Sequence, residues 1–260
     1  SVGIGNTLYG AAPIILTGLA VAFAFKTGLF NIGASGQMMI GAYVSIHIGV
    51  LWNLPIHLHW IVALIGAAIG GLVWGLVTGL LKAFRNVNEV VTSIMMNYIA
   101  ANLIIILIRN NVYNKDAARS LNILDSAQLP TTNLFEGSSF NIGFFIAVII
   151  VIIAHIIIHR STLGFELRAT GLSREGAKYA GMKTKKSIIS SFCFSGAFAG
   201  IAGGIAYLVS GKTISIAYTI FTEGFDGISV ALLGLGEPLG ALFAGLFLSH
   251  LRQGGFYMQI

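Results

Sequence analysis

Polar side chains that can recognise a solute stand in the stretch KTGLFNIGASGQMMIGAY, residues 26–43, where Asn31, Ser35 and Gln37 interrupt an apolar chain. Glycines surround them at positions 28, 33, 36 and 41. Asn and Gln side chains both donate and accept hydrogen bonds, which suits an uncharged polar solute better than an ion. Within hydrocarbon, a helix broken by glycines is tolerated only inside the protein or at a cavity. The stretch predicts a glycine-broken helix near residues 28–41 that lines a solute pathway, or else a turn with polar caps between two helices.

Two further apolar regions contain polar groups. EVVTSIMMNYIA, residues 89–100, places Ser93 and Asn97 on one helix face, with Glu89 one turn earlier. FTEGFDGISVALLG, residues 221–234, places Glu223 and Asp226 at the start of an apolar run. Carboxylates there are costly unless hydrated or paired, which makes them functional candidates. The alternatives are helix–helix hydrogen bonding for Asn97 and stabilisation by a helix N-terminus for the carboxylates.

Several short motifs do not support another chemistry. GKT at 211–213 lacks the earlier glycine of a phosphate loop, and GLGEPLG at 234–240 has the wrong glycine spacing for a dinucleotide turn. His155 and His159 are four residues apart and share a helix face, as metal ligands can. No carboxylate or cysteine lies near them in sequence, so we expect an interfacial role without a metal.

The composition sets the class of protein that holds these groups. Of the 260 residues, 56% are hydrophobic and 9% are charged, whereas soluble domains carry about 25% charged residues. We therefore predict an all-α, polytopic integral membrane helix bundle. The single Cys193 excludes an internal disulfide. Because the chain starts at Ser1 without a methionine, we expect it to be part of a longer polypeptide.

About seven apolar segments are long enough to cross a bilayer. They run over Leu8–Phe25, Phe30–Trp52, Trp60–Leu81, Val90–Ile108, Asn141–Ile158, Ile188–Val209 and Phe225–Leu251. Eleven of the fifteen Lys and Arg residues fall in one alternating set of connections, namely Lys26, Lys82, Arg85, the 159–187 loop and Arg252. The positive-inside rule places this set in the cytoplasm and Ser1 outside. The net charge of +6 therefore reports topology and does not indicate nucleic-acid binding.

Small residues and two long loops complete the organisation. Glycines repeat every four residues at 71, 75 and 79 and again at 196, 200 and 204, which favours close helix packing, or else helices that slide between two transport states. The external loop at about 109–139 either folds over the outer face or is a passive connection. The cytoplasmic loop at about 160–187 predicts short amphipathic helices that dock on a partner or lie on acidic lipid.

Four ordered blocks carry a resemblance to a known family. They are GLFNIGASGQMMIGAY, NEVVTSIMMNYIA, GFELRATGLSREGAKYAGM and GFDGISVALLGLGEPLGALFAGLF, and they extend over nearly the whole chain. Together they resemble the permease subunits of bacterial ABC importers for simple sugars, branched-chain amino acids and nucleosides. The chain looks most like the nucleoside branch, whose partner is a Bmp-like substrate-binding lipoprotein. It differs at Ser35, where nucleoside permeases commonly have an acidic residue.

The resemblance implies a single transmembrane permease domain over residues 1–260, in a bacterial cytoplasmic membrane, that transports and is not itself an enzyme. It implies no cofactor or metal in this chain, with ATP bound by separate cytoplasmic ATPase subunits. It also implies a second permease subunit, usually a different homologue, and an external binding protein that meets residues 52–59, 109–139 and 210–224. Spans that rock around a central site would expose it to each side in turn.

The resemblance and the polar pattern together assign two sets of residues. The ATPase coupling set is Gly164, Glu166, Arg168, Gly171, Arg174, Ala177 and Gly181. The substrate pathway set is Phe30, Asn31, Ser35, Gln37, Ser93, Asn97, Phe221, Glu223, Phe225 and Asp226, in which a phenylalanine ring would stack on a nucleobase. The alternatives are the same architecture importing a sugar or an amino acid, an ion-coupled transporter or channel that works without ATP, and a membrane enzyme.

Overall fold

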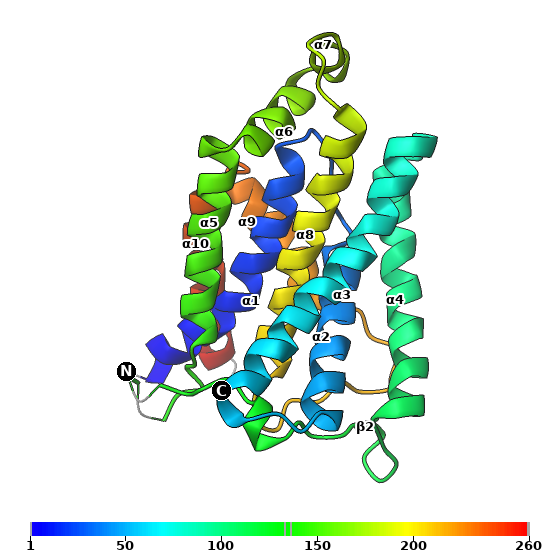
Figure 1. The fold of residues 1–260 in the computed structure, drawn as a ribbon. Helices are drawn as coiled ribbons and strands as arrows, with labels where there is room; N and C mark the ends of the chain where they lie inside the picture. Colours follow the sequence, from blue (N-terminus) through cyan, green and yellow to red (C-terminus); the bar gives the residue numbers. More distant parts are fainter. Residues whose placement is uncertain (1, 133, 136, 259–260) are drawn as a thin grey trace.

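The computed structural model describes residues 2–132, 134–135 and 137–258. These residues form a bundle of α-helices with a small antiparallel hairpin at one end (Figure 1). The helices are α1 (Val2–Phe25), α2 (Ala34–Leu51), α3 (Ile56–Arg85), α4 (Glu89–Asn111), α5 (Gly143–Arg160), α6 (Thr162–Leu172), α7 (Arg174–Tyr179), α8 (Thr184–Tyr207), α9 (Thr222–Leu233) and α10 (Pro238–Met258). The hairpin is β1 (Tyr113–Asn114) with β2 (Arg119–Ser120), followed by the 3-10 turn η1 (Asp125–Ala127).

Six of the described helices, α1 to α5 and α8, are long and apolar enough to cross a membrane. They correspond to the first six apolar segments, so the prediction of an all-α polytopic bundle is confirmed. Helices α1, α2 and α8 are mostly buried, whereas α3, α4 and α5 leave rows of Ile, Val and Leu exposed. This distribution fits central helices surrounded by others that face lipid.

The seventh apolar segment is two helices, which corrects the prediction of one span. Helix α9 ends at Leu233, the chain turns through Leu235 and Gly236 with positive φ angles of 54° and 66°, and α10 starts at Pro238. Proline at a helix start and glycine in a left-handed turn both favour such a reversal. The apolar character continues through the turn, which is why hydropathy alone does not reveal it.

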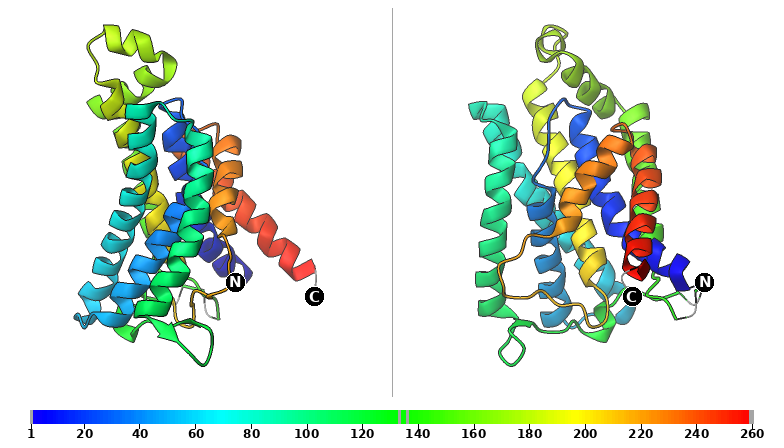
Figure 2. Two further views of the ribbon diagram at one scale, coloured as in Figure 1. Left: turned by 90° about the vertical axis from the view of Figure 1, so that its right-hand side faces the viewer. Right: turned by 180° about the vertical axis from the view of Figure 1, so that it is seen from behind.

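This reversal changes the side on which Arg252 lies. The turn residue Glu237 contacts Lys26, just after α1, and His159, in the last turn of α5. Helix α10 then runs back to the end where the chain starts, and leans away from the bundle on the way (Figures 1 and 2). Arg252 therefore leaves the predicted cytoplasmic set, and eleven minus one leaves ten of the fifteen basic residues at the α6–α7 end. We call this the cytoplasmic end, because the positive-inside rule still places it there.

The glycine repeats hold α3 against α8, which confirms the predicted close helix packing and shows which helices it joins. A Cβ on Gly71 would collide with the carbonyl oxygen of Gly196, and one on Gly200 would collide with that of Ala67. On the other side of α8, Gly200 also lies against Gly41 of α2. Backbones this close leave no room for larger side chains, so the small residues set the spacing of the bundle.

The predicted helix break lies between α1 and α2. Helix α1 ends at Phe25, Gly28 turns the chain with a φ of 68°, and residues 29–31 carry no helical structure before α2 starts at Ala34. Gly36 and Gly41 lie within continuous helix, so only the first part of residues 28–41 is broken. Helix α2 consequently starts part-way across the bundle (Figure 1).

The segment between α4 and α5 lies across the end opposite α6 and α7 (Figure 1). Its backbone N–H groups donate to three other segments: Ser120 to Ile214, Leu124 to Gly49 and Leu129 to Leu208, each at 2.9 Å. The external loops thus pack on one another and cover that end of the bundle.

Candidate solute pathway

A buried network of polar side chains holds the broken segment in place. The Asn31 Oδ1 atom accepts a hydrogen bond from the Gly33 N–H at 2.9 Å, which forms a local turn before α2. The Asn31 Nδ2 group donates to Gln37 Oε1 at 2.9 Å and to Ser195 Oγ at 2.6 Å. Ser195 in turn donates to the Ala20 carbonyl at 2.6 Å. The network therefore joins the break to α1, α2 and α8.

Asn97 of α4 supports the same segment from the other side. Its Oδ1 atom accepts from the Gly36 N–H at 2.8 Å, and its Nδ2 group donates to the Ile32 carbonyl at 3.0 Å. The first N–H groups of a helix have no acceptor within the helix, and the Asn97 side chain provides an acceptor for one of them in α2. Buried backbone groups without partners cost free energy, so this single amide stabilises the start of the half-crossing helix.

Ser35 connects the break to the start of α9. Its hydroxyl donates to the Phe221 carbonyl at 3.0 Å, directly before α9 begins. Gly224, in the first turn of α9, packs on the Ser35 backbone so closely that a Cβ there would collide with it. The starts of α2 and α9 therefore meet inside the bundle.

The predicted pathway residues Asn31, Ser35, Gln37, Ser93 and Asn97 all belong to this buried region, with exposures of 0–2%. Four of them form the bonds above, while the Ser93 hydroxyl has no partner among the described residues. None of the five lines the two cavities described next. Their role in solute contact stays a prediction, and their visible role is to hold the broken helix.

Two cavities adjoin at the start of α9, in the half of the bundle opposite the cytoplasmic end. One has a volume of about 340 Å³ and the other about 290 Å³, and both are lined by Tyr207, Thr213 and Glu223. The first lies between α1, α8 and α10, and the second between α2, α4 and the 213–222 segment. Small-molecule pockets typically measure roughly 300–1,000 Å³, so the pair is large enough for a small solute.

An aromatic pair and a carboxylate line these cavities. The rings of Tyr207 and Phe221 stack with centroids 5.0 Å apart and planes at 17°. Glu223 lies in the first turn of α9, where the helix dipole favours its negative charge. Within the described chain its carboxylate has one weak hydrogen bond, 3.5 Å from the Thr222 hydroxyl. The carboxylate is therefore free to accept hydrogen bonds from a solute.

Basic side chains add donors to the first cavity. Arg252 and Lys212 both line it, and Arg252 forms an ion pair with Asp226. Because Asp226 lies one helical turn after Glu223, the ion pair ties α9 to α10 at the cavity wall. Sequence reasoning assigned Arg252 to the opposite side of the membrane and so missed it as a lining residue.

Two predicted aromatic residues lie away from the cavities. Phe30 stacks on Phe25 at the cytoplasmic end of α1, with ring centroids 5.3 Å apart. Phe225 is 41% exposed and lines neither cavity. In contrast, Tyr9 and Tyr207 do line them and carried no sequence signal, because a tyrosine within an apolar span is common in helix packing.

The residues predicted to contact an ATPase lie on α6, α7 and the turn that follows, at the tip of the cytoplasmic end (Figure 1). Gly164 and Ala177 are buried, whereas Glu166, Arg168, Gly171, Arg174 and Gly181 are at least partly exposed. Ser161 and Ser173 cap the two helices by accepting from Gly164 N–H and Gly176 N–H, each at 3.0 Å. The same tip exposes Leu172 and Tyr179, at 90% and 91%, which the sequence reading did not single out.

Helix α6 touches the break between α1 and α2. A Cβ on Gly171 would collide with the Lys26 carbonyl oxygen, and the Gly171 carbonyl lies 3.2 Å from the Cβ position of Gly28. The cytoplasmic tip is therefore in backbone contact with the turn that leads into the broken segment. The fold thus forms one contiguous series of contacts: α6, the 26–28 turn, the start of α2, and the start of α9.

Comparisons with known proteins give the family. The family model described as branched-chain amino acid transport system / permease component matches residues 3–260. The guanosine ABC transporter permease protein NupP of Bacillus subtilis is 40% identical over 99% of this chain and 74% of its own length. The nucleoside permease protein NupB of Lactococcus lactis is 36% identical over 96% and 71%, and the glucose permease protein TsgB13 of Haloferax volcanii is 31% identical over 99% and 70%.

A second guanosine permease protein of Bacillus subtilis, NupQ, is 25% identical over 95% of the chain. No solved structure matches the chain. The family match extends over nearly all residues and therefore includes all six apolar spans of the described chain. The chain belongs to the permease family of branched-chain amino acid and related ABC transport systems, and it is a multi-pass protein of the cytoplasmic membrane.

Proposed function

We propose that this chain is a permease subunit of an ABC importer that moves nucleosides, and that the solute passes through the two cavities around Glu223. The observation that carries the proposal is the Glu223 carboxylate, which has one weak hydrogen bond among the described residues and lines the cavities beside the stacked Tyr207 and Phe221 rings. It lies where helices α2 and α9 both start inside the bundle. The names of the relatives NupP and NupB support a nucleoside as the cargo.

The chemistry of the lining suits a nucleoside. Ribose hydroxyls and base N–H groups donate hydrogen bonds, and the Glu223 carboxylate accepts them. Arg252 and Lys212 offer donors for base carbonyl oxygens, and the Tyr207 ring offers an aromatic face for a base. Half-helix starts that meet near the centre are where transporters of other folds also bind their substrates.

Transport would be coupled through the series of contacts that starts at α6. A cytoplasmic ATPase would dock on the exposed Leu172 and Tyr179, because large apolar side chains at a tip fit a groove on a partner. Movement of α6 would push Gly171 against the 26–28 turn and shift the start of α2. The Ser35 bond to Phe221 would carry the shift to Glu223. The sequence has no phosphate loop, so ATP would bind on the separate ATPase.

The proposal includes further partners. Two guanosine permease proteins of one organism, NupP and NupQ, both match this chain, which supports a second, homologous permease beside it. The external surfaces at 52–59, 109–139 and 210–224 would receive a substrate-binding protein. The 109–139 segment is hydrogen-bonded to the 210–224 segment through the Ser120 N–H and the Ile214 carbonyl, and the Ser126 hydroxyl lies 2.7 Å from the His59 ring, so the three segments present a joint surface.

The test is uptake of labelled guanosine, uridine, ribose and glucose by vesicles that carry the whole transporter, with a Glu223→Gln variant beside the wild type. We expect guanosine or uridine uptake that Glu223→Gln reduces. A sugar cargo is the second candidate, because TsgB13 is named a glucose permease. Uptake of glucose or ribose without nucleoside uptake would favour that candidate. Uptake unchanged by Glu223→Gln would remove the cavity from the pathway.

A further inference from the structure

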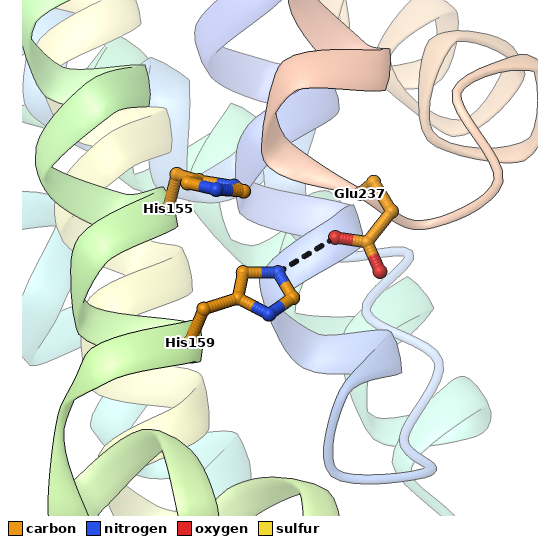
Figure 3. A group of neighbouring side chains, drawn as sticks. All are labelled: His155, His159 and Glu237. Atoms are coloured by element: carbon orange, nitrogen blue, oxygen red, sulfur yellow. Dashed lines mark hydrogen bonds and ion pairs between the residues drawn. The ribbon is translucent and has the colours of Figure 1, made fainter.

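Three side chains with metal-binding atoms meet at the cytoplasmic ends of α5 and α10 (Figure 3). His155 and His159 lie one turn apart on α5, with ring centroids 4.5 Å apart. Glu237 stands directly before α10 and faces both rings. One ligand atom from each of the three residues lies within 4.8 Å of the others. The cluster lines neither cavity and is not on α6 or α7, so the proposed transport cycle does not account for it.

Among the described residues, hydrogen bonds join two of the three side chains and leave one nitrogen of the third without a partner. The His159 Nε2 group lies 3.0 Å from Glu237 Oε2, while Lys26 bonds the other carboxylate oxygen, Oε1. His155 Nδ1 is buried and has no hydrogen-bond partner among the described residues. A buried polar atom without a partner is uncommon and calls for an explanation, such as an ion.

The fold also removes the reason for excluding a metal. From the sequence we did not expect a metal ion, because no carboxylate lies near the two histidines along the chain. Glu237 is 78 residues from His159 in sequence, and the turn between α9 and α10 brings it to hydrogen-bonding distance. Two imidazoles and one carboxylate are a donor set found in zinc sites with an open fourth position.

We propose that His155, His159 and Glu237 form a site for a divalent transition metal ion, with Zn²⁺ as the ion that best suits two nitrogen ligands and one oxygen ligand. Histidines at positions i and i+4 present their nitrogens on one helix face. With metal–ligand distances of about 2.0–2.1 Å, tetrahedral ligand atoms lie about 3.3 Å apart. The pair His159–Glu237 is already near that spacing, and the ligand atom of His155 lies within 4.8 Å of both.

Lys26 sets the affinity of this site. Its ammonium group occupies Oε1 and leaves Oε2 for the ion, but its positive charge opposes a cation nearby. Burial raises the pKa of Glu237, yet the hydrogen bonds and charges of Lys26 and His159 outweigh this effect and hold the pKa below its usual value.

A bound ion would join the cytoplasmic end of α5 to the turn between α9 and α10. Helix α6 starts two residues after α5 ends, so the ion would restrain α5 where the cytoplasmic tip begins. We expect Zn²⁺ to slow transport by limiting movement between these elements. This consequence rests on the proposed function, whereas binding of the ion does not.

The experiment measures metal binding by the purified full chain in detergent, prepared with an affinity tag that contains no histidine. Isothermal titration with Zn²⁺ gives stoichiometry and affinity, and the visible absorption of Co²⁺ reports nitrogen ligation in a low-coordinate site. The variants are His155→Ala, Glu237→Gln and Lys26→Met, and His57→Ala is the control because it removes an exposed histidine at the other end.

We expect one ion per chain and a loss of at least about tenfold in affinity in His155→Ala and Glu237→Gln, because even outer contacts of a metal site contribute about 10–100-fold. Lys26→Met should bind more tightly than the wild type, and that gain cannot come from misfolding. His57→Ala should bind as the wild type does. An absence of Zn²⁺ binding, or equal binding in His155→Ala and the wild type, would overturn the proposal.

Discussion

Replacing Asn97 by alanine tests whether the polar network holds the broken helix or contacts the solute. The change leaves the buried Gly36 N–H without its acceptor at 2.8 Å and the part-buried Ile32 carbonyl without its donor at 3.0 Å. An unpaired buried group costs about 1–3 kcal/mol, and a partly hydrated carbonyl costs about 1 kcal/mol. The sum predicts that Asn97→Ala destabilises the start of α2 by about 2–4 kcal/mol.

The assay compares thermal unfolding of purified protein with uptake kinetics in vesicles. Asn102→Ala is the matched control, because Asn102 lies on the same helix and, among the described residues, its side chain bonds the exposed Tyr98 carbonyl one turn earlier. We expect Asn97→Ala to lower the unfolding temperature and the maximal uptake rate while the KM for solute stays near that of the wild type. A raised KM with unchanged unfolding would refute this reasoning and make Asn97 a solute contact.

Three other substitutions test, one at a time, the role of the cavity in transport, the contact of α6 with the 26–28 turn, and the close packing of the helices. Glu223→Gln should abolish most uptake yet change the free energy of unfolding by less than about 0.5 kcal/mol, since its carboxylate has only one weak bond among the described residues. Gly171→Ala should reduce uptake more than ATP hydrolysis by the assembled transporter, because its Cβ would strike the Lys26 carbonyl. Gly200→Leu should destabilise the bundle by about 1–3 kcal/mol or more, measured by thermal unfolding, because its side chain would strike Ala67.

Glycines with free space give the controls for these changes. A Cβ on Gly3 or Gly255 meets nothing within 4 Å, so alanine there should leave uptake unchanged and should not lower stability. Equal effects of Gly3→Ala and Gly171→Ala would show that helix propensity, and not the contact with the 26–28 turn, sets the result. Normal stability of Gly200→Leu would contradict the close packing of α3 on α8.

The sequence predicts the elements whose physical cause is local. Apolar length predicts the first six spans, whereas the orientation inferred from charge bias stays a prediction. The four-residue glycine repeats predict close helix packing, since small residues at that spacing share a helix face, and the structure shows that the two repeats meet each other. The cluster of glycines from Gly28 to Gly36 predicts the helix break to within a few residues.

Features that depend on contacts between segments far apart in the sequence cannot be predicted from local sequence patterns. The turn after α9 is hidden because apolar residues flank it on both sides, although Gly234, Gly236 and Pro238 are signals for a reversal. That reversal moves Arg252 to the cavity and Glu237 to the two histidines. One missed turn therefore accounts for the missed lining residue and for the unexpected meeting of Glu237 with His155 and His159.

The sequence also did not predict that the polar side chains of the broken segment would bond to one another inside the protein. Asn31 and Gln37 have the side chains that a solute site needs, and they use them on each other and on Ser195. Polar groups within a span satisfy the backbone of a broken helix before they are available to a ligand. Glu223 differs, because its weak bonding leaves a charged group facing a cavity.

The most direct test of the account is guanosine uptake by vesicles that carry the whole transporter, with and without internal ATP. The account predicts uptake that requires ATP, that unlabelled uridine or guanosine inhibits and free ribose does not, and that Glu223→Gln reduces strongly. Guanosine uptake that proceeds equally without ATP would contradict the role of this permease in an ATP-driven importer.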